Sequence, residues 1–199
     1  MVFKKNLMLK VFFFINFFIL LLNGCSYQYN NLEADSANVA KVNLNVNSFE
    51  IKKNKLNDLH NKNELITTIN KKVLKNFEDW ILIKFAISGD QNSSYLNILK
   101  IDTSWTQKNL ENKSILSVIK EKKNTYTTTL NFDLTFTNNE GSTKILKVSS
   151  NIDIMLSNNF SINKRNKVVN NRVNKLIELI DTKVTKQLNE HALKEFIFN

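Results

Sequence analysis

The sequence contains few side chains of the types that carry out catalysis or bind metal ions. It has two histidines, His60 and His191, and a single cysteine, Cys25. Neither histidine has a second histidine or a cysteine at the spacing that a metal site requires. Both lie among charged and polar residues, so we interpret them as solvated surface side chains. The sequence therefore predicts no metal site.

Carboxylates that could act as general acids or bases occur as Glu78 beside Asp79, and as Asp58 upstream of Glu64. Charged residues near a helix end are usually solvated, so we expect neither group to be catalytic. There is no Gly-x-Ser-x-Gly motif, and three glycines with no proline exclude glycine-rich phosphate-binding loops. We therefore expect no catalytic residue, no cofactor and no enzymatic activity.

The composition is that of a globular protein, with 42% hydrophobic and 23% charged residues among 199. The formal net charge of +10 has to be discounted, because Lys4, Lys5 and Lys10 lie in the N-terminal segment described next. Without them, 25 basic residues face 18 acids, a net charge of +7. Only Arg165 and Arg172 carry the guanidinium group that phosphate and base recognition favours, and the lysines are dispersed. We expect no nucleic-acid partner.

The N-terminus has the pattern of an export signal. Three lysines and no acid in residues 1–10 precede the apolar run 11–22, which has one polar member. That run is too short for a bilayer core, which needs about 20 helical residues, but it fits the hydrophobic region of a secretory signal. It closes with Leu22-Asn23-Gly24-Cys25, which resembles the lipobox of bacterial lipoproteins. The alternative interpretation is a buried structural cysteine after an ordinary signal peptide.

A lipobox implies that residues 1–24 are a signal peptide and that Cys25 is acylated after cleavage. Three acyl chains would attach the protein permanently to membrane lipid, and no intramolecular disulfide can form with one cysteine. Ser26 resembles the non-acidic residue that follows the cysteine in lipoproteins sorted to the outer membrane. Residues 25–40 are polar and aperiodic, so we interpret them as a tether, with a docked strand as the alternative. Residues 41–199 are expected to form a single domain.

Hydrophobic periodicity predicts the elements of this domain. Alternating apolar residues indicate strands over 42–51, 80–87 and 96–105, the last with a β-bulge between Ile98 and Leu99, and a turn at 89–92. A helix is expected to start near Asn61, whose spacing to Glu64 resembles a capping box. Its apolar stripe comprises Leu65, Ile66, Ile69, Val73, Leu74 and Phe77.

The second half of the domain is predicted to be a hairpin followed by a long helix. After an exposed loop at 107–123, strands Leu130–Phe136 and Ile145–Ile154 flank a turn at 138–142. A helix capped by Ser161 is expected to continue without interruption towards Asn199. The predicted fold class is α+β, in two layers, with two helices packed on one face of a mainly antiparallel sheet of four to five strands.

The lipobox, the first strand, the amphipathic helix, the Phe-rich hairpin and the long last helix together resemble the lipopolysaccharide-assembly lipoproteins (LptE-like proteins). This resemblance implies two helices on a four-stranded sheet, and a non-enzymatic outer-membrane lipoprotein that faces the periplasm. It further implies an outer-membrane β-barrel protein and lipopolysaccharide as partners. On this interpretation Cys25 is the lipid attachment site, and the hairpin, with Phe132, Phe136, Lys144 and Lys147, is the contact surface.

Other functions stay open on the sequence alone. One alternative is an auxiliary lipoprotein of an ABC-type phospholipid-transport system, and another is an envelope lipoprotein of unknown role. A cell-wall hydrolase is disfavoured because the sequence offers no nucleophile or metal-ligand constellation for it.

The lipobox generates a first prediction. We expect the mature protein to lack residues 1–24 and to partition into detergent, whereas Cys25→Ser leaves a full-length precursor without acyl chains. Intact-mass spectrometry of protein from native membranes measures both properties. A free thiol on Cys25 in that sample contradicts the prediction.

Overall fold

The computed structural model describes residues 39–53, 63–109, 122–190 and 193–198. Cys25, His60 and His191 lie outside these residues, as do the expected signal peptide and nearly all of the expected tether. The elements follow the order β1 (Val42–Lys53), α2 (Glu64–Lys84), β2 (Phe85–Asn109), β3 (Lys122–Thr137), β4 (Thr143–Ser157), α3 (Ile162–Glu190), the 3-10 turn η2 (Lys194–Phe196) and β5 (Ile197–Phe198). Among the described helices, none is both long and apolar enough to cross a bilayer.

Within the described residues the strands form one sheet in the order β4-β3-β2-β1-β5. β1 and β2 are parallel, and the other neighbours are antiparallel. Parallel neighbours need a long crossover connection, and α2 lies in the connection between β1 and β2. The predicted α+β class with a mainly antiparallel sheet is therefore confirmed.

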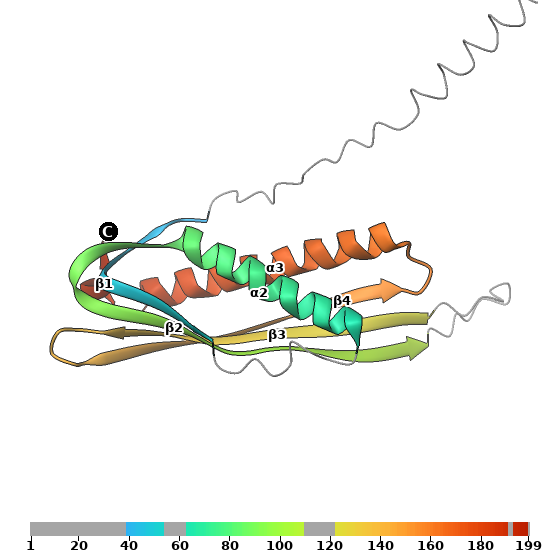
Figure 1. The fold of residues 1–199 in the computed structure, drawn as a ribbon, viewed down its shortest axis with the longest axis horizontal. Helices are drawn as coiled ribbons and strands as arrows, with labels where there is room; N and C mark the ends of the chain where they lie inside the picture. Colours follow the sequence, from blue (N-terminus) through green and yellow to red (C-terminus); the bar gives the residue numbers. More distant parts are fainter. Residues whose placement is uncertain (1–38, 54–62, 110–121, 191–192, 199) are drawn as a thin grey trace, which may run out of the picture. The chain divides into compact units, whose positions relative to one another are not determined.

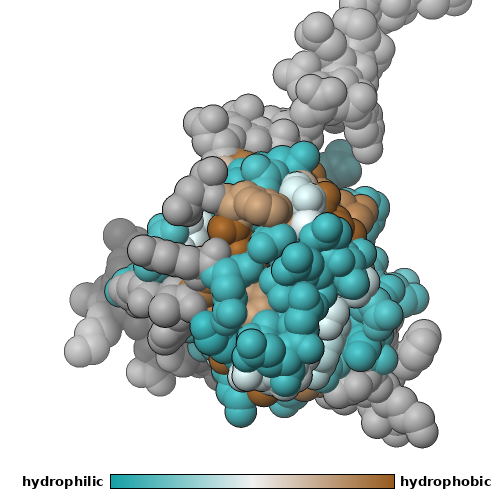
Figure 2. Space-filling view, turned by 90° about the vertical axis from the view of Figure 1, so that its left-hand side faces the viewer, coloured by the Kyte–Doolittle hydropathy of each residue, from teal (hydrophilic) through white to brown (hydrophobic). Residues whose placement is uncertain are grey.

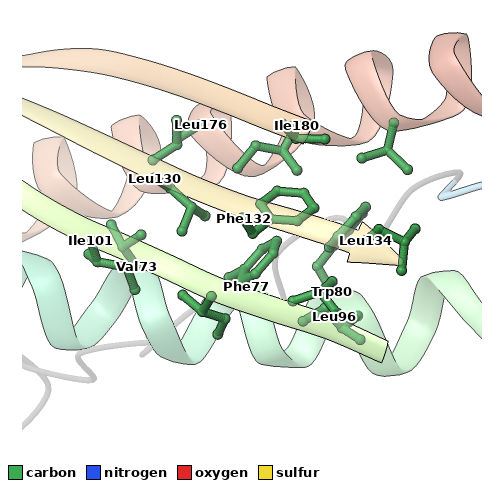
Figure 3. Packing of buried hydrophobic residues seen from close by; sticks show 14 of the residues in the cluster. Val73, Phe77, Trp80, Leu96, Ile101, Leu130, Phe132, Leu134, Leu176 and Ile180 are labelled. Atoms are coloured by element: carbon green, nitrogen blue, oxygen red, sulfur yellow. The ribbon is translucent and has the colours of Figure 1, made fainter. Parts of the chain in front are cut away.

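Both helices cover the same face of the sheet (Figure 1). Alternate side chains of β4 are buried beneath them, and those between are exposed, as the period of two requires. In the core, the rings of Phe77 in α2 and Phe132 in β3 are 4.7 Å apart between centroids. Figure 3 shows Phe132 between Phe77 and Ile180, which α3 contributes. One continuous core therefore joins both helices to the sheet.

The first helix is longer than predicted. Residues 80–84, expected to begin a strand, form its last turn, and β2 starts at Phe85. Phe77, Trp80, Ile81 and Lys84 continue the buried stripe at three- and four-residue steps, so helical periodicity overrides the β propensity of this segment. The N-cap is Asn63 rather than Asn61: its Oδ1 accepts a hydrogen bond from the backbone N–H of Leu65 at 3.0 Å.

The expected turn at 89–92 is wrong, because β2 runs through it. The register advances from Leu44↔Ile87 to Val46↔Asn92, so β2 carries several extra residues opposite β1. Gly89 makes this irregularity possible: a Cβ there would lie 2.6 Å from the Val46 nitrogen, closer than side chains tolerate. The second irregularity, predicted beside Leu99, is confirmed, because the register with β3 shifts between Ile98 and Lys100.

The hairpin and the cap of the last helix are confirmed. The strands are longer than predicted, so both ends of the expected 107–123 loop belong to β2 and β3. The Lys164 N–H donates to Ser161 Oγ at 3.3 Å.

The end of the chain differs from the predicted uninterrupted helix. α3 stops at Glu190, and β5 pairs with β1 through Leu44↔Ile197. Phe196 is fully buried, and its ring centroid lies 5.3 Å from that of Phe136. The burial of Phe196 beside Phe136 goes with this change in the path of the chain.

Two leucines of α3 provide a matched test of this packing. Leu176 is 0% exposed and Leu179 is 37% exposed. We expect Leu176→Ala to lower the free energy of unfolding by about 2–5 kcal/mol, because it leaves a cavity. Leu179→Ala should cost clearly less, since less apolar surface is buried there. Urea unfolding followed by circular dichroism measures both, and equal losses would show that α3 is packed differently.

Candidate partner-contact surface

The hairpin turn is held by one asparagine. Asn138 Oδ1 accepts hydrogen bonds from the backbone N–H groups of Glu140 at 3.1 Å and Ser142 at 2.8 Å. Gly141 closes the turn with φ = 82°, a left-handed conformation that glycine adopts without strain. The turn residues 139–142 are exposed. The sequence thus builds a defined, polar tip between two long strands.

The sheet face away from the helices, here called the outer face, carries polar cross-strand pairs. Thr127 Oγ1 donates to Asp153 Oδ1 at 2.7 Å, and Ser149 Oγ donates to Asn131 Oδ1 at 2.8 Å. Such pairs satisfy hydrogen-bonding groups across neighbouring strands. These pairs suit a hydrated or hydrogen-bonding partner, and the exposed Ile145 and Met155 on the same face of β4 add local apolar surface.

β4 is an edge strand, and α3 covers part of its open edge. Lys183 Nζ donates to the Ser149 carbonyl at 2.7 Å, and Arg172 Nε donates to the Asp153 carbonyl at 2.8 Å. These bonds occupy backbone acceptors that would otherwise attract another strand. They lie away from the turn, so the hairpin tip extends beyond this covered part of the edge.

The two lysines predicted to act together lie on opposite faces of the sheet. Lys147 pairs in register with Asp133 on the outer face, where its side chain is exposed. Lys144 pairs in register with buried Phe136, which places it on the helix side. A partner on the outer face can therefore contact Lys147 directly, whereas Lys144 lies on the other side of the sheet.

Lys144 holds the chain's last turn against the hairpin. Its Nζ lies 2.8 Å from Glu195 Oε1 and 5.6 Å from the ring centroid of Phe196. The hydrogen bond from Lys144 lowers the pKa of Glu195 below its ordinary value. The positive charge of Lys144 and a hydrogen bond from Asn138 act in the same direction, and burial has a smaller opposing effect. The sequence offered no signal for this ion pair, because a helix continuing past residue 190 would place Glu195 elsewhere.

Phe132 and Phe136 were expected in the contact surface, but the structure places them in the core. Both side chains are buried among the residues that pack beneath the helices. Their alternation with polar neighbours correctly indicated a one-sided strand, but not which side a partner would meet. Most exposed residues of the hairpin are polar, with Ile145 and Met155 of β4 as the exposed apolar exceptions.

The described residues contain no group of three or more His, Cys, Asp or Glu side chains that could hold a metal ion. Glu78 is bound to Lys53, and Asp79 Oδ2 lies 2.6 Å from Lys75 Nζ. The adjacent carboxylates Glu78 and Asp79 therefore take part in ion pairs between surface side chains. Asp58, of the other group considered for acid–base chemistry, lies outside the described residues.

No family model and no curated protein matches this sequence. Solved structures with a similar fold include a minor lipoprotein from Acinetobacter baumannii, at 12% identity and a TM-score of 0.32, covering 70% of this chain and 88% of that chain. Rare lipoprotein B from Shewanella oneidensis is 12% identical, with a TM-score of 0.31, and the match covers 73% of this chain and 100% of that chain. A homologue of a neuraminyllactose-binding hemagglutinin from Helicobacter pylori is 14% identical, with a TM-score of 0.31, and the match covers 72% of this chain and 88% of that chain.

The Lys144–Glu195 pair generates a pH prediction. Because the pKa of Glu195 is lower in the folded chain than in the unfolded chain, its contact stabilises the fold above the ordinary carboxyl range. That stabilisation is lost as the pH falls through the lowered folded-state pKa. We expect Lys144→Met to raise the pKa of Glu195 towards its ordinary value, as followed by carboxyl carbon NMR. An unchanged titration would mean that Lys144 does not set this pKa.

Proposed function

We propose that this protein is a lipid-anchored, non-enzymatic component of lipopolysaccharide assembly in the outer membrane. Acylated Cys25 attaches it to the membrane, and its domain faces the periplasm as the partner of an outer-membrane β-barrel protein. The observation that carries the proposal is the lipobox-like Leu22–Cys25 ahead of a domain with two helices on one sheet face. That architecture has the two helices on one sheet face expected for LptE-like proteins, with five strands among the described residues in place of the four that the resemblance implied.

The contact surface supports a binding role. Lys147 is exposed on the outer face, among polar pairs that can exchange hydrogen bonds with sugars, phosphates or a strand. An ammonium group binds phosphate as a point charge. We therefore assign first contact with lipopolysaccharide or the barrel to the outer face and the hairpin tip, and a supporting role to Lys144 through Glu195.

Depletion of the protein tests the proposal in cells. We expect loss of surface lipopolysaccharide and misassembly of the barrel, and recovery of that barrel when the acylated protein is captured from membranes in mild detergent. Normal lipopolysaccharide and barrel assembly after depletion would overturn the proposal. Capture of transporter subunits instead would favour the phospholipid-transport alternative.

Charge reversal separates the contact from the fold. Lys147→Glu should weaken binding to lipopolysaccharide several-fold and leave the melting temperature nearly unchanged, because exposed charges contribute little to stability. Wild-type binding should also weaken with added salt, as screened charges do. Lys71→Glu, on the exposed side of α2, is the control with the same change of charge. Equal binding by both variants would remove Lys147 from the contact.

A further inference from the structure

The last turn of α2 reverses the usual arrangement of apolar and charged residues. Leu82 is 72% exposed and Ile83 is 46% exposed, whereas the side chain of Lys84 is 0% exposed. Ile87, just after the helix, is 54% exposed. Scattered apolar residues on a surface are ordinary, but three within six positions form a local apolar surface. We call these three residues, Leu82, Ile83 and Ile87, the apolar end.

The buried lysine fixes this orientation. Lys84 Nζ lies 2.9 Å from Asp181 Oδ1 and donates to Thr185 Oγ1 at 2.7 Å, both on α3. Asp181 Oδ1 also accepts a hydrogen bond from Trp80 Nε1 at 3.0 Å. A buried ammonium group needs such partners, and breaking the pair is costly. The helix therefore cannot rotate Leu82 and Ile83 inward without leaving Lys84 unpaired.

The apolar end lies where the N-terminal chain joins the domain. β1 is parallel to β2, with Val42 opposite Phe85 and Leu44 opposite Ile87. Residues 39–41, which precede β1, consequently lie near the last turn of α2. Figure 2 faces this end of the domain and shows hydrophobic side chains in its upper part above a hydrophilic lower part.

We propose that the apolar end docks on the surface of the lipid bilayer that holds acylated Cys25. This inference rests on the proposed lipid anchor. Residues 26–38 span at most about 45 Å when extended, and about 20 Å on average as a flexible coil, so the bilayer is always within reach. Apolar side chains at the end of a helix can enter the boundary between headgroups and acyl chains.

Apolar contact, rather than charge, drives this docking. Lys41 and Asp90, near the apolar end along the strands, are both exposed and carry opposite charges. The three residues of the apolar end carry no charge themselves, so neutral phosphatidylcholine should suffice as the target. This distinguishes the apolar end from the outer face at Lys147, where binding should depend on salt.

Single-cysteine labelling tests the proposal in the full acylated protein. Acylation consumes the Cys25 thiol, so a cysteine introduced by Ile83→Cys carries the only site for a fluorescent label. Met155→Cys is the control, because Met155 is exposed and pairs with Thr125 towards the opposite end of the sheet. The labelled proteins are placed in phosphatidylcholine vesicles that contain doxyl-labelled acyl chains.

We expect the label at position 83 to be quenched several-fold more by the doxyl lipid than the label at 155, and to be protected from aqueous iodide. Adding Leu82→Asn to Ile83→Cys should reduce that quenching without a change in melting temperature, since Leu82 is exposed. Equal iodide quenching at both positions, with acylation verified by mass, overturns the docking proposal alone.

Two other outcomes are decisive. Protection at position 83 in native membranes, but not in protein-free vesicles, would mean that a protein covers the apolar end, and would overturn lipid docking. Labelling of Cys25 itself would show a free thiol, and would overturn the lipid anchor on which the inference rests.

Discussion

The packing of both helices on one face of the sheet determines most other features of this domain. Because side chains alternate across a strand, alternate residues of each strand lie beneath the helices, and most of the large apolar residues are among them. Phe132 and Phe136 consequently belong to the core. Thr127 and Asp153 meet on the outer face, where they hydrogen-bond each other. A partner at the outer face therefore meets mostly polar side chains, with Ile145 and Met155 exposed among them, and does not meet the phenylalanines of the hairpin.

The polar side-chain contacts between α2 and α3 add a second constraint. The fully buried ammonium group of Lys84 forms an ion pair with the partly exposed Asp181 across the α2–α3 contact, and Trp80 donates to the same carboxylate. Removing Asp181 would leave the charge of Lys84 buried and uncompensated, so the pair sets the rotation of α2 about its own axis. The exposure of Leu82 and Ile83 follows from this rotation. A polar contact in the interior thus decides which apolar side chains reach the surface.

Together these constraints produce two surfaces of different physical character. The outer face is polar and carries Lys147, which suits contacts that depend on charge and hydrogen bonds. The apolar end lies beside the residues that lead towards Cys25, which suits contact with lipid. In the function that we propose, the second surface would orient the domain on its membrane, leaving the first for the barrel and lipopolysaccharide.

Periodicity and local chemistry in the sequence were enough to predict the two-layer fold, the β3–β4 hairpin, the bulge beside Leu99 and the Ser161 cap. The hairpin, the bulge and the cap depend on residues close together in the chain, and the two-layer fold follows from the apolar periodicity of each element. The export signal and the acylation of Cys25 are predictions from the sequence alone, because residues 1–38 lie outside the described residues. Only the tertiary structure decided that residues 80–84 are helical, because the polar partners of Trp80 and Lys84 come from α3, about a hundred positions away. The opposite orientation of Lys144 and Lys147 follows from their odd spacing within one strand, so the sequence could have predicted it. Only the tertiary structure decided that the chain leaves α3 to bury Phe196 and that Lys144 meets Glu195, since distant packing partners are not encoded in local spacing.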